Sequence, residues 1–119
     1  MLHDLLHSIF KGLWGIHNNA GINGINAPAE WLMLKNYQDV LNINTLGLID
    51  VTTTFLPLVK KEHGRIVNTA SMMGRVAFEG MGPYCVSKYA VEAFSDALRY
   101  VATFLALLDL YMLIIFNQD

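Results

Sequence analysis

The chain has 119 residues, enough for one domain with a real core or for a piece of a larger one. It is 54% hydrophobic and 15% charged, which fits a mostly buried α/β layer, a membrane-associated chain or part of a larger protein. A net charge of −2 and a pI near 6.0 give no electrostatic argument for nucleic-acid binding. The single cysteine, Cys85, excludes an intrachain disulfide, and four scattered histidines predict no metal site.

The amino-terminal part of the chain is predicted to hold a helix, a strand and a turn-rich loop. Apolar residues at helical spacing predict a short amphipathic helix over residues 1–10. The apolar run Trp14–Asn18 predicts a buried strand that feeds a loop, and His17 within it is expected to find a local hydrogen bond. Gly24 and Pro28 break any periodicity in the next segment, which is therefore predicted to form turns.

A long helical region in two pieces is predicted from about Glu30 to Glu62, because apolar residues recur there every three or four positions. Asn44 falls inside this apolar stripe. A buried amide without hydrogen bonds costs about 1–3 kcal/mol. Asn44 is therefore expected either to satisfy local backbone or to organise a site or a water molecule. Pro57 is expected to kink the helix.

A short β-branched strand is predicted at Arg65–Thr69, and Ser71 follows its carboxyl end, where ligand sites lie in open parallel sheets. The glycine-rich residues 72–83 predict a loop. The next helix is predicted to open near Pro83 and to continue through Val101. The order helix, strand, helix, strand, helix favours a parallel sheet with helices on its faces.

Tyr84 and Lys88 are four residues apart and so share one face of this helix. A cation held beside a phenol favours the phenolate. The phenol could then exchange a proton with an alcohol or a carbonyl near neutral pH. Ser71 would be a second donor to the same oxygen. This grouping predicts acid–base chemistry at the carboxyl edge of the sheet.

The last segment, residues 101–119, is apolar, and Asp109 is the only charged residue between Val101 and Phe116. Three interpretations stay open: a buried or interfacial helix, a transmembrane span, or a helix followed by a strand at Tyr111–Phe116.

Landmarks of the chain resemble those of the short-chain dehydrogenase/reductase family: NNAG at Asn18–Gly21, then Asn44, Ser71 and Tyr84-x-x-x-Lys88. Three segments resemble in sequence the branch that holds retinol dehydrogenases, 17β-hydroxysteroid dehydrogenases and 3-hydroxybutyrate dehydrogenase. They are GLWGIHNNAGI, FLPLVKKEHGRIVNTASMMGR and PYCVSKYAVEAFSDALRY. The resemblance covers about residues 11–100.

The resemblance implies an α/β fold, a partial Rossmann-like (doubly wound) parallel sheet with flanking helices. Residues 1–100 would form a partial domain that holds the catalytic half, and residues 101–119 would be an apolar tail outside the family pattern. The family's first strand and its glycine-rich turn, T-G-x-x-x-G-x-G, have no counterpart in this sequence. The predicted strand Trp14–Asn18 would therefore be an unpaired edge in a sheet of two or three strands.

The resemblance also implies catalytic roles. Tyr84 looks like the general acid/base, and Lys88 would favour its phenolate and hold the ribose hydroxyls of a nicotinamide cofactor. Ser71 would orient the substrate oxygen, and Asn44 would support a proton-relay water beside Lys88.

The cofactor implied by the resemblance is NAD or NADP, which supplies the hydride. Asn19 and the backbone of Ala20 and Gly21 would lie against it, together with Tyr84 and Lys88. The residue that would select between the two cofactors is absent with the glycine motif. His17 stands where the family usually has an aliphatic residue.

The implied activity is the interconversion of an alcohol and its carbonyl, on a lipophilic hydroxysteroid or retinol-like substrate. The alternatives are a truncated, non-catalytic form that binds full-length relatives through helices at about 35–62 and 83–100, and a poorly folded product. A homo-oligomer and membrane association through the tail are further expectations. The resemblance favours an intracellular location at the endoplasmic reticulum membrane, with the mitochondrion as the alternative.

Overall fold

The computed structural model of the protein describes residues 2–9, 11–105 and 109–113, with side chains described at 4–5, 8–9 and 11–100. The elements in chain order are α1 (Leu2–Ile9), β1 (Gly15–Asn18), η1 (Ala29–Trp31), α2 (Leu34–Leu41), η2 (Asn42–Leu46), α3 (Gly47–Lys61), β2 (Arg65–Thr69), η3 (Met72–Gly74), α4 (Gly82–Leu105) and β3 (Asp109–Leu113). η1 and η3 are short 3₁₀ helices, whereas η2 is a π-helix that joins α2 to α3.

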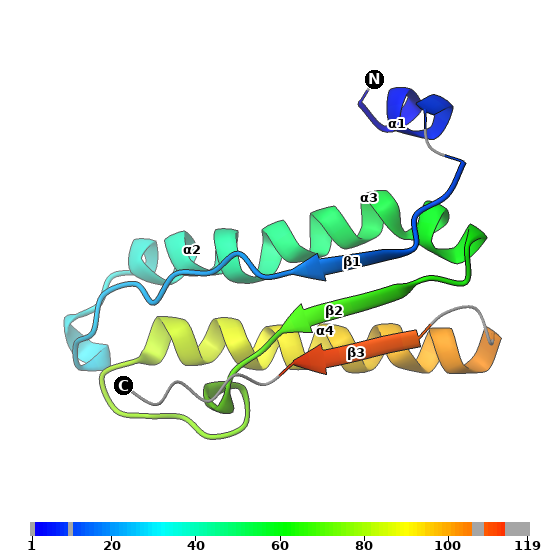
Figure 1. The fold of residues 1–119 in the computed structure, drawn as a ribbon. Helices are drawn as coiled ribbons and strands as arrows, with labels where there is room; N and C mark the ends of the chain where they lie inside the picture. Colours follow the sequence, from blue (N-terminus) through cyan, green and yellow to red (C-terminus); the bar gives the residue numbers. More distant parts are fainter. Residues whose placement is uncertain (1, 10, 106–108, 114–119) are drawn as a thin grey trace.

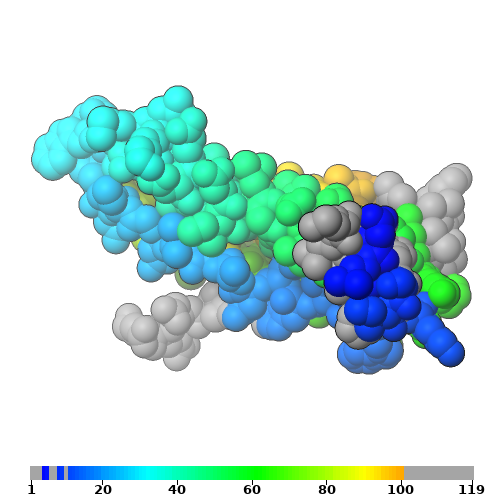
Figure 2. Space-filling view, turned by 90° about the horizontal axis from the view of Figure 1, so that it is seen from above, coloured from blue at the N-terminus to red at the C-terminus, as the bar shows by residue number. Residues whose placement is uncertain are grey.

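The three strands form one parallel sheet in the order β1-β2-β3. Ile16 of β1 lies opposite Ile66 of β2, which lies opposite Leu110 of β3. α3 and α4 run along one face of this sheet, and α1 stands outside these two layers, beyond the amino end of β1 (Figure 1). Figure 2, seen from above, shows α2 and α3 along one side of the β1 segment. The predicted parallel α/β sheet with flanking helices is confirmed.

The alternation of side chains along β2 explains which face the helices cover. Ile66 and Asn68 are buried, whereas Arg65, Val67 and Thr69 are partly exposed. Successive side chains of a strand point to opposite faces, so the first pair faces the helices and the other three residues face away from them. The buried apolar residues among those described are Val40, Leu48, Leu58, Val59, Ile66, Ala70, Cys85 and Val91.

Hydrogen-bonded polar side chains cross this interior. The Asn18 side chain donates to Thr52 Oγ1 at 2.9 Å and to Asn68 Oδ1 at 2.8 Å. Asn68 in turn donates to Ser95 Oγ of α4 at 2.8 Å. Because a buried polar group needs a partner, this chain of bonds fixes the two strands and α4 in one register.

The helical region predicted from Glu30 to Glu62 contains a π-helical turn that the sequence did not predict. α3 runs through Pro57 to Lys61, so the proline does not end the helix. The kink expected at Pro57 stays a prediction. The π-helical turn lies at η2, around Asn44. π-Helical turns often occur at functional sites. The spacing of apolar residues could not reveal this turn.

Part of the carboxyl-terminal segment is described. α4 continues to Leu105, and β3 adds a third parallel strand beside β2. This arrangement agrees with the interpretation of a helix followed by a strand, although the strand begins at Asp109 rather than at Tyr111. The expectations for residues 106–108 and 114–119 lie outside the described residues. None of the described helices combines the length and the apolar character needed to cross a membrane.

Substituting Asn68→Ala should destabilise the chain by about 2–4 kcal/mol, since it leaves the Asn18 and Ser95 side chains without their shared partner and opens a cavity. Urea unfolding followed by circular dichroism would measure the change. Val67→Ala is the matched control, because its side chain lies on the opposite, partly exposed face of the same strand. Equal losses in the two variants would contradict the role given to the polar chain.

Candidate active site

The predicted site residues gather at the carboxyl edge of β1 and β2. Asn18 and Asn68 are paired in the parallel register, so the segments that follow them leave the sheet side by side. One segment carries Asn19, Ala20 and Gly21, and the other carries Ser71. Carboxyl ends of parallel strands are where open α/β sheets bind ligands.

Ser71 and Tyr84 line one hollow of about 310 Å³. The serine comes from the end of β2, whereas the tyrosine comes from the first turn of α4, which the buried Pro83 starts with a pre-set φ angle. Three methionines, Met72, Met73 and Met81, supply much of the rest of the wall. The hollow is thus lined by two hydroxyl-bearing residues and by flexible apolar side chains.

The Ser71 side chain is buried and caps η3. Its Oγ accepts a hydrogen bond from the backbone N–H of Met73 at 3.2 Å. A hydroxyl that accepts from backbone still has its own hydrogen to donate. The hydrogen bond from Met73 therefore positions the Ser71 hydroxyl and leaves its own hydrogen free for donation to a ligand.

Lys88 lies behind the tyrosine on the same face of α4, with Nζ 5.6 Å from the centre of the Tyr84 ring. Its ammonium is buried and donates to the carbonyl oxygen of Thr69 at 2.9 Å. Burial lowers the pKa of Lys88 below 10.5, because desolvation disfavours the charged form. Among the described residues Thr69 O is the hydrogen-bond acceptor of this ammonium, which has three N–H donors.

Asn44 is buried within η2 and binds the loop after β1. Its amide accepts from the Ile22 N–H at 2.8 Å and donates to the Ile22 carbonyl at 2.8 Å. The same side-chain nitrogen donates to Ser87 Oγ at 2.9 Å. From the sequence, Asn44 is expected either to bind local backbone or to organise a site. It does bind backbone, but that of Ile22 in a distant segment. Both amide hydrogens are used, so a water could bind only to Oδ1.

The side chains of Asn44 and Lys88 both lie close to Gly21. A Cβ placed on this glycine would lie 3.5 Å from Asn44 Oδ1 and 3.9 Å from Lys88 Nζ. The two polar atoms therefore face the same backbone position. A small group approaching the Gly21 backbone would encounter both of them.

Asn19 and Ala20 line a neighbouring hollow of about 430 Å³ between β1 and α3, together with His17. Thr69 Oγ1 donates to Asn19 Oδ1 at 2.9 Å, so the His17 Nε2, 3.0 Å from the same hydroxyl, is the donor in that contact. His17 has a hydrogen bond, as expected, but its partner lies on the neighbouring strand rather than close by in the sequence. The structure thus places Ser71 and Tyr84 in one hollow, Asn44 and Lys88 near Gly21, and Asn19 and Ala20 in a second hollow.

Sequence reasoning did not identify Thr69, Ser87 or the methionines as parts of the site. Thr69 is the last residue of β2, and its place at the carboxyl end of a predicted strand was a usable signal. Ser87 lies one residue before Lys88, but its bond to Asn44 joins residues far apart in the sequence. In the described part of the chain, no three histidine, cysteine or acidic side chains gather as a metal site.

The stability contributed by Lys88 should depend on pH. Between its lowered folded pKa and 10.5, the unfolded chain binds more protons than the folded chain, so the unfolding free energy rises with pH. Lys88→Met removes this titration. The stability of the wild-type chain minus that of the variant should therefore increase from about pH 7 toward about pH 10. Urea unfolding across this range would test the trend, with the exposed Lys35→Met as baseline; a falling difference would contradict it.

The family model described as short chain dehydrogenase matches residues 2–102. Retinol dehydrogenase 16 of Mus musculus is 55% identical over 89 residues, which are 75% of this chain and 28% of that protein. 17-beta-hydroxysteroid dehydrogenase type 6 of Bos taurus is 54% identical over the same shares of the two chains. This chain thus spans between a quarter and a third of the length of these relatives.

Solved structures share the fold. The oxidoreductase yciK from E. coli superimposes with a TM-score of 0.81 at 29% identity, covering 87% of this chain and 43% of that one. A short chain dehydrogenase from Shigella flexneri complexed with NADP gives a TM-score of 0.80 at 30% identity, covering 87% and 44% of the two chains. The chain belongs to the short chain dehydrogenase family, in the branch that includes retinol and 17-beta-hydroxysteroid dehydrogenases.

Proposed function

We propose that this chain carries the catalytic half of an NAD(P)-dependent oxidoreductase that interconverts an alcohol and its carbonyl. The observation that carries the proposal is that Ser71 and Tyr84 line one hollow, with the buried Lys88 ammonium 5.6 Å from the centre of the Tyr84 ring. Family membership supports it, because the relatives are named as dehydrogenases.

Each side chain has a role that its surroundings support. Tyr84 gives a proton to the substrate oxygen in reduction and takes it back in oxidation. Ser71, whose Oγ already accepts from Met73 N–H, donates its own hydrogen to the same oxygen and orients it. Lys88 places a positive charge next to the phenol and so stabilises its anion during proton transfer. The cofactor supplies the hydride when it is bound.

The residues present fit the nicotinamide side of the cofactor. Lys88 has N–H donors beyond the one used by Thr69 O, so it can bind ribose hydroxyls. The Gly21 backbone, without a Cβ, lets a ligand approach Lys88 and Asn44 closely. Asn19 and Ala20 line the adjoining hollow. The 119 residues contain no T-G-x-x-x-G-x-G turn for the pyrophosphate, so we expect weak cofactor binding by this chain.

The substrate we propose is a lipophilic alcohol or ketone. The hollow beside Ser71 and Tyr84 has methionine walls, and methionine adapts to large apolar ligands. Relatives at about 55% identity are named for retinol and for 17-beta-hydroxysteroids. Both compounds present one oxygen on a large hydrocarbon body, which suits a site with two hydroxyl donors and apolar walls.

Tyr84→Phe should lower kcat for NAD(P)H-dependent reduction of retinaldehyde or a 17-ketosteroid by roughly a hundredfold or more, because it removes the proton donor. Cofactor affinity, measured by calorimetry, should change little. Tyr100→Phe is the control, since Tyr100 lies exposed on the same helix. Unchanged turnover in Tyr84→Phe, or no cofactor binding by the wild-type chain, would overturn the proposed activity for these residues.

A second candidate function is association with relatives through α4. Exposed apolar or aromatic residues recur on this helix every three or four positions, which places them in one stripe: Val86, Tyr89, Ala93, Ala97 and Tyr100. Such a stripe on a helix is suited to packing against another helix. A non-catalytic chain could bind a full-length relative in this way and alter its activity.

Tyr89→Glu should weaken this association, because it places a charge at the centre of the stripe. Size-exclusion chromatography with light scattering, and co-purification with a full-length retinol dehydrogenase, would measure it. Leu5→Glu, an exposed apolar position on α1, is the control. A wild-type chain that stays monomeric and does not co-purify would argue against this function.

A further inference from the structure

The loop that follows Ser71 packs on the helix that carries Tyr84 and Lys88. The closest approach is at Gly74, the last residue of η3. A Cβ placed there would lie 2.9 Å from Glu92 Cγ and 2.9 Å from the Lys88 carbonyl oxygen, closer than any side chain tolerates. η3 and α4 are thus in direct backbone contact at the turn between Lys88 and Glu92.

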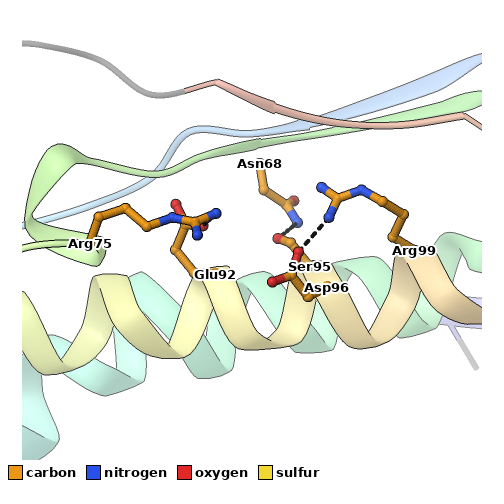
Figure 3. Close-up of polar contacts among 6 residues, drawn as sticks. All are labelled: Asn68, Arg75, Glu92, Ser95, Asp96 and Arg99. Atoms are coloured by element: carbon orange, nitrogen blue, oxygen red, sulfur yellow. Dashed lines mark hydrogen bonds and ion pairs between the residues drawn. The ribbon is translucent and has the colours of Figure 1, made fainter.

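An ion pair stands next to this contact. Arg75 Nη2 lies 2.6 Å from Glu92 Oε2. Figure 3 shows the two side chains next to each other, Arg75 from the loop and Glu92 from α4. The Glu92 side chain is only 7% exposed, whereas Arg75 is 57% exposed. Within the described residues, neither buried oxygen of Glu92 accepts a well-aligned hydrogen bond. The Arg75 guanidinium is therefore the charge that compensates the buried carboxylate.

The pair joins two separate elements, unlike the other ion pair on α4. Asp96 and Arg99 both belong to α4, and both are partly exposed, so their contact links nothing beyond the helix (Figure 3). Between the two pairs, Ser95 binds Asn68 of β2. One face of α4 is therefore tied to β2 by Ser95 and to η3 by Glu92.

The position of the Ser71 hydroxyl depends on η3. Ser71 Oγ accepts from Met73 N–H, and the Ser71 carbonyl accepts from Gly74 N–H at 2.9 Å. Because both contacts lie within the segment Ser71–Gly74, a movement of η3 away from α4 would carry the Ser71 side chain with it. Whatever holds η3 on α4 thus holds the Ser71 hydroxyl in the hollow that it shares with Tyr84.

We propose that Arg75 and Glu92 are positioning residues: their ion pair ties η3 to α4 and fixes the Ser71 hydroxyl relative to the Tyr84 phenol. The consequence for catalysis rests on the proposed function of Ser71, but the tie itself does not. Breaking a pair that has one buried member leaves an uncompensated charge, so the loop should loosen when Arg75 is removed.

The test uses Arg75→Gln in the full chain without ligand. Hydrogen exchange at the amides of Gly74 and Val76, which bond to Ser71 O and Met72 O, should speed up by about tenfold. The NMR signal of the Met73 amide, which reports on Ser71 Oγ, should shift. Amides of β2 should keep their exchange rates. Arg75→Lys, which keeps the charge, should restore most of the protection.

Asp96→Asn is the matched control, because it removes the other ion pair of α4 without touching η3. It should leave the Met73 signal and the η3 exchange rates unchanged. The proposal is overturned if Arg75→Gln leaves η3 unchanged, if Asp96→Asn loosens η3 equally, or if Arg75→Gln unfolds the whole chain. These readouts need no turnover, so they separate this inference from a failure of the proposed function, which Tyr84→Phe decides.

Discussion

The burial of the Lys88 ammonium is the constraint around which the site is built. A charge removed from water is costly unless it is hydrogen-bonded, and Lys88 meets this need at the carbonyl oxygen of Thr69. That bond ties α4 to the last residue of β2. Because Tyr84 lies one turn earlier on the same helix, fixing Lys88 also fixes the phenol against the segment that carries Ser71. Burial also disfavours the charged form of Lys88, which lowers its pKa.

Polar side chains in the interior specify how the other elements meet. Asn18, Asn68 and Ser95 join two strands to α4, and Asn44 joins η2 to the loop after β1. Each bond on its own contributes a modest net stabilisation of about 1 kcal/mol. An unsatisfied partner would cost more, so shifted registers are disfavoured. The chain uses these amides to select one arrangement of the elements that carry the site.

The local elements could be predicted from sequence, and the long-range partners could not. β2 and the start of α4 follow from β-branched residues and from Pro83, which act within a few neighbours. For Asn44, the sequence showed a polar residue on an apolar stripe, but its partners at Ile22 and Ser87 depend on the tertiary fold. The π-helical geometry of η2 likewise cannot be predicted from the local spacing of residues. The same holds for the contact between Arg75 and Glu92.

Side chains on the outer face of β1 and β2 contact one another. His17 binds Thr69 there, and Arg65 lies 5.0 Å from the centre of the Trp14 ring. The contacts that hold Ser71, Tyr84, Lys88 and Asn44 come instead from β2, η3, η2 and the loop after β1. The geometry of the two hydroxyls is therefore set within these 119 residues.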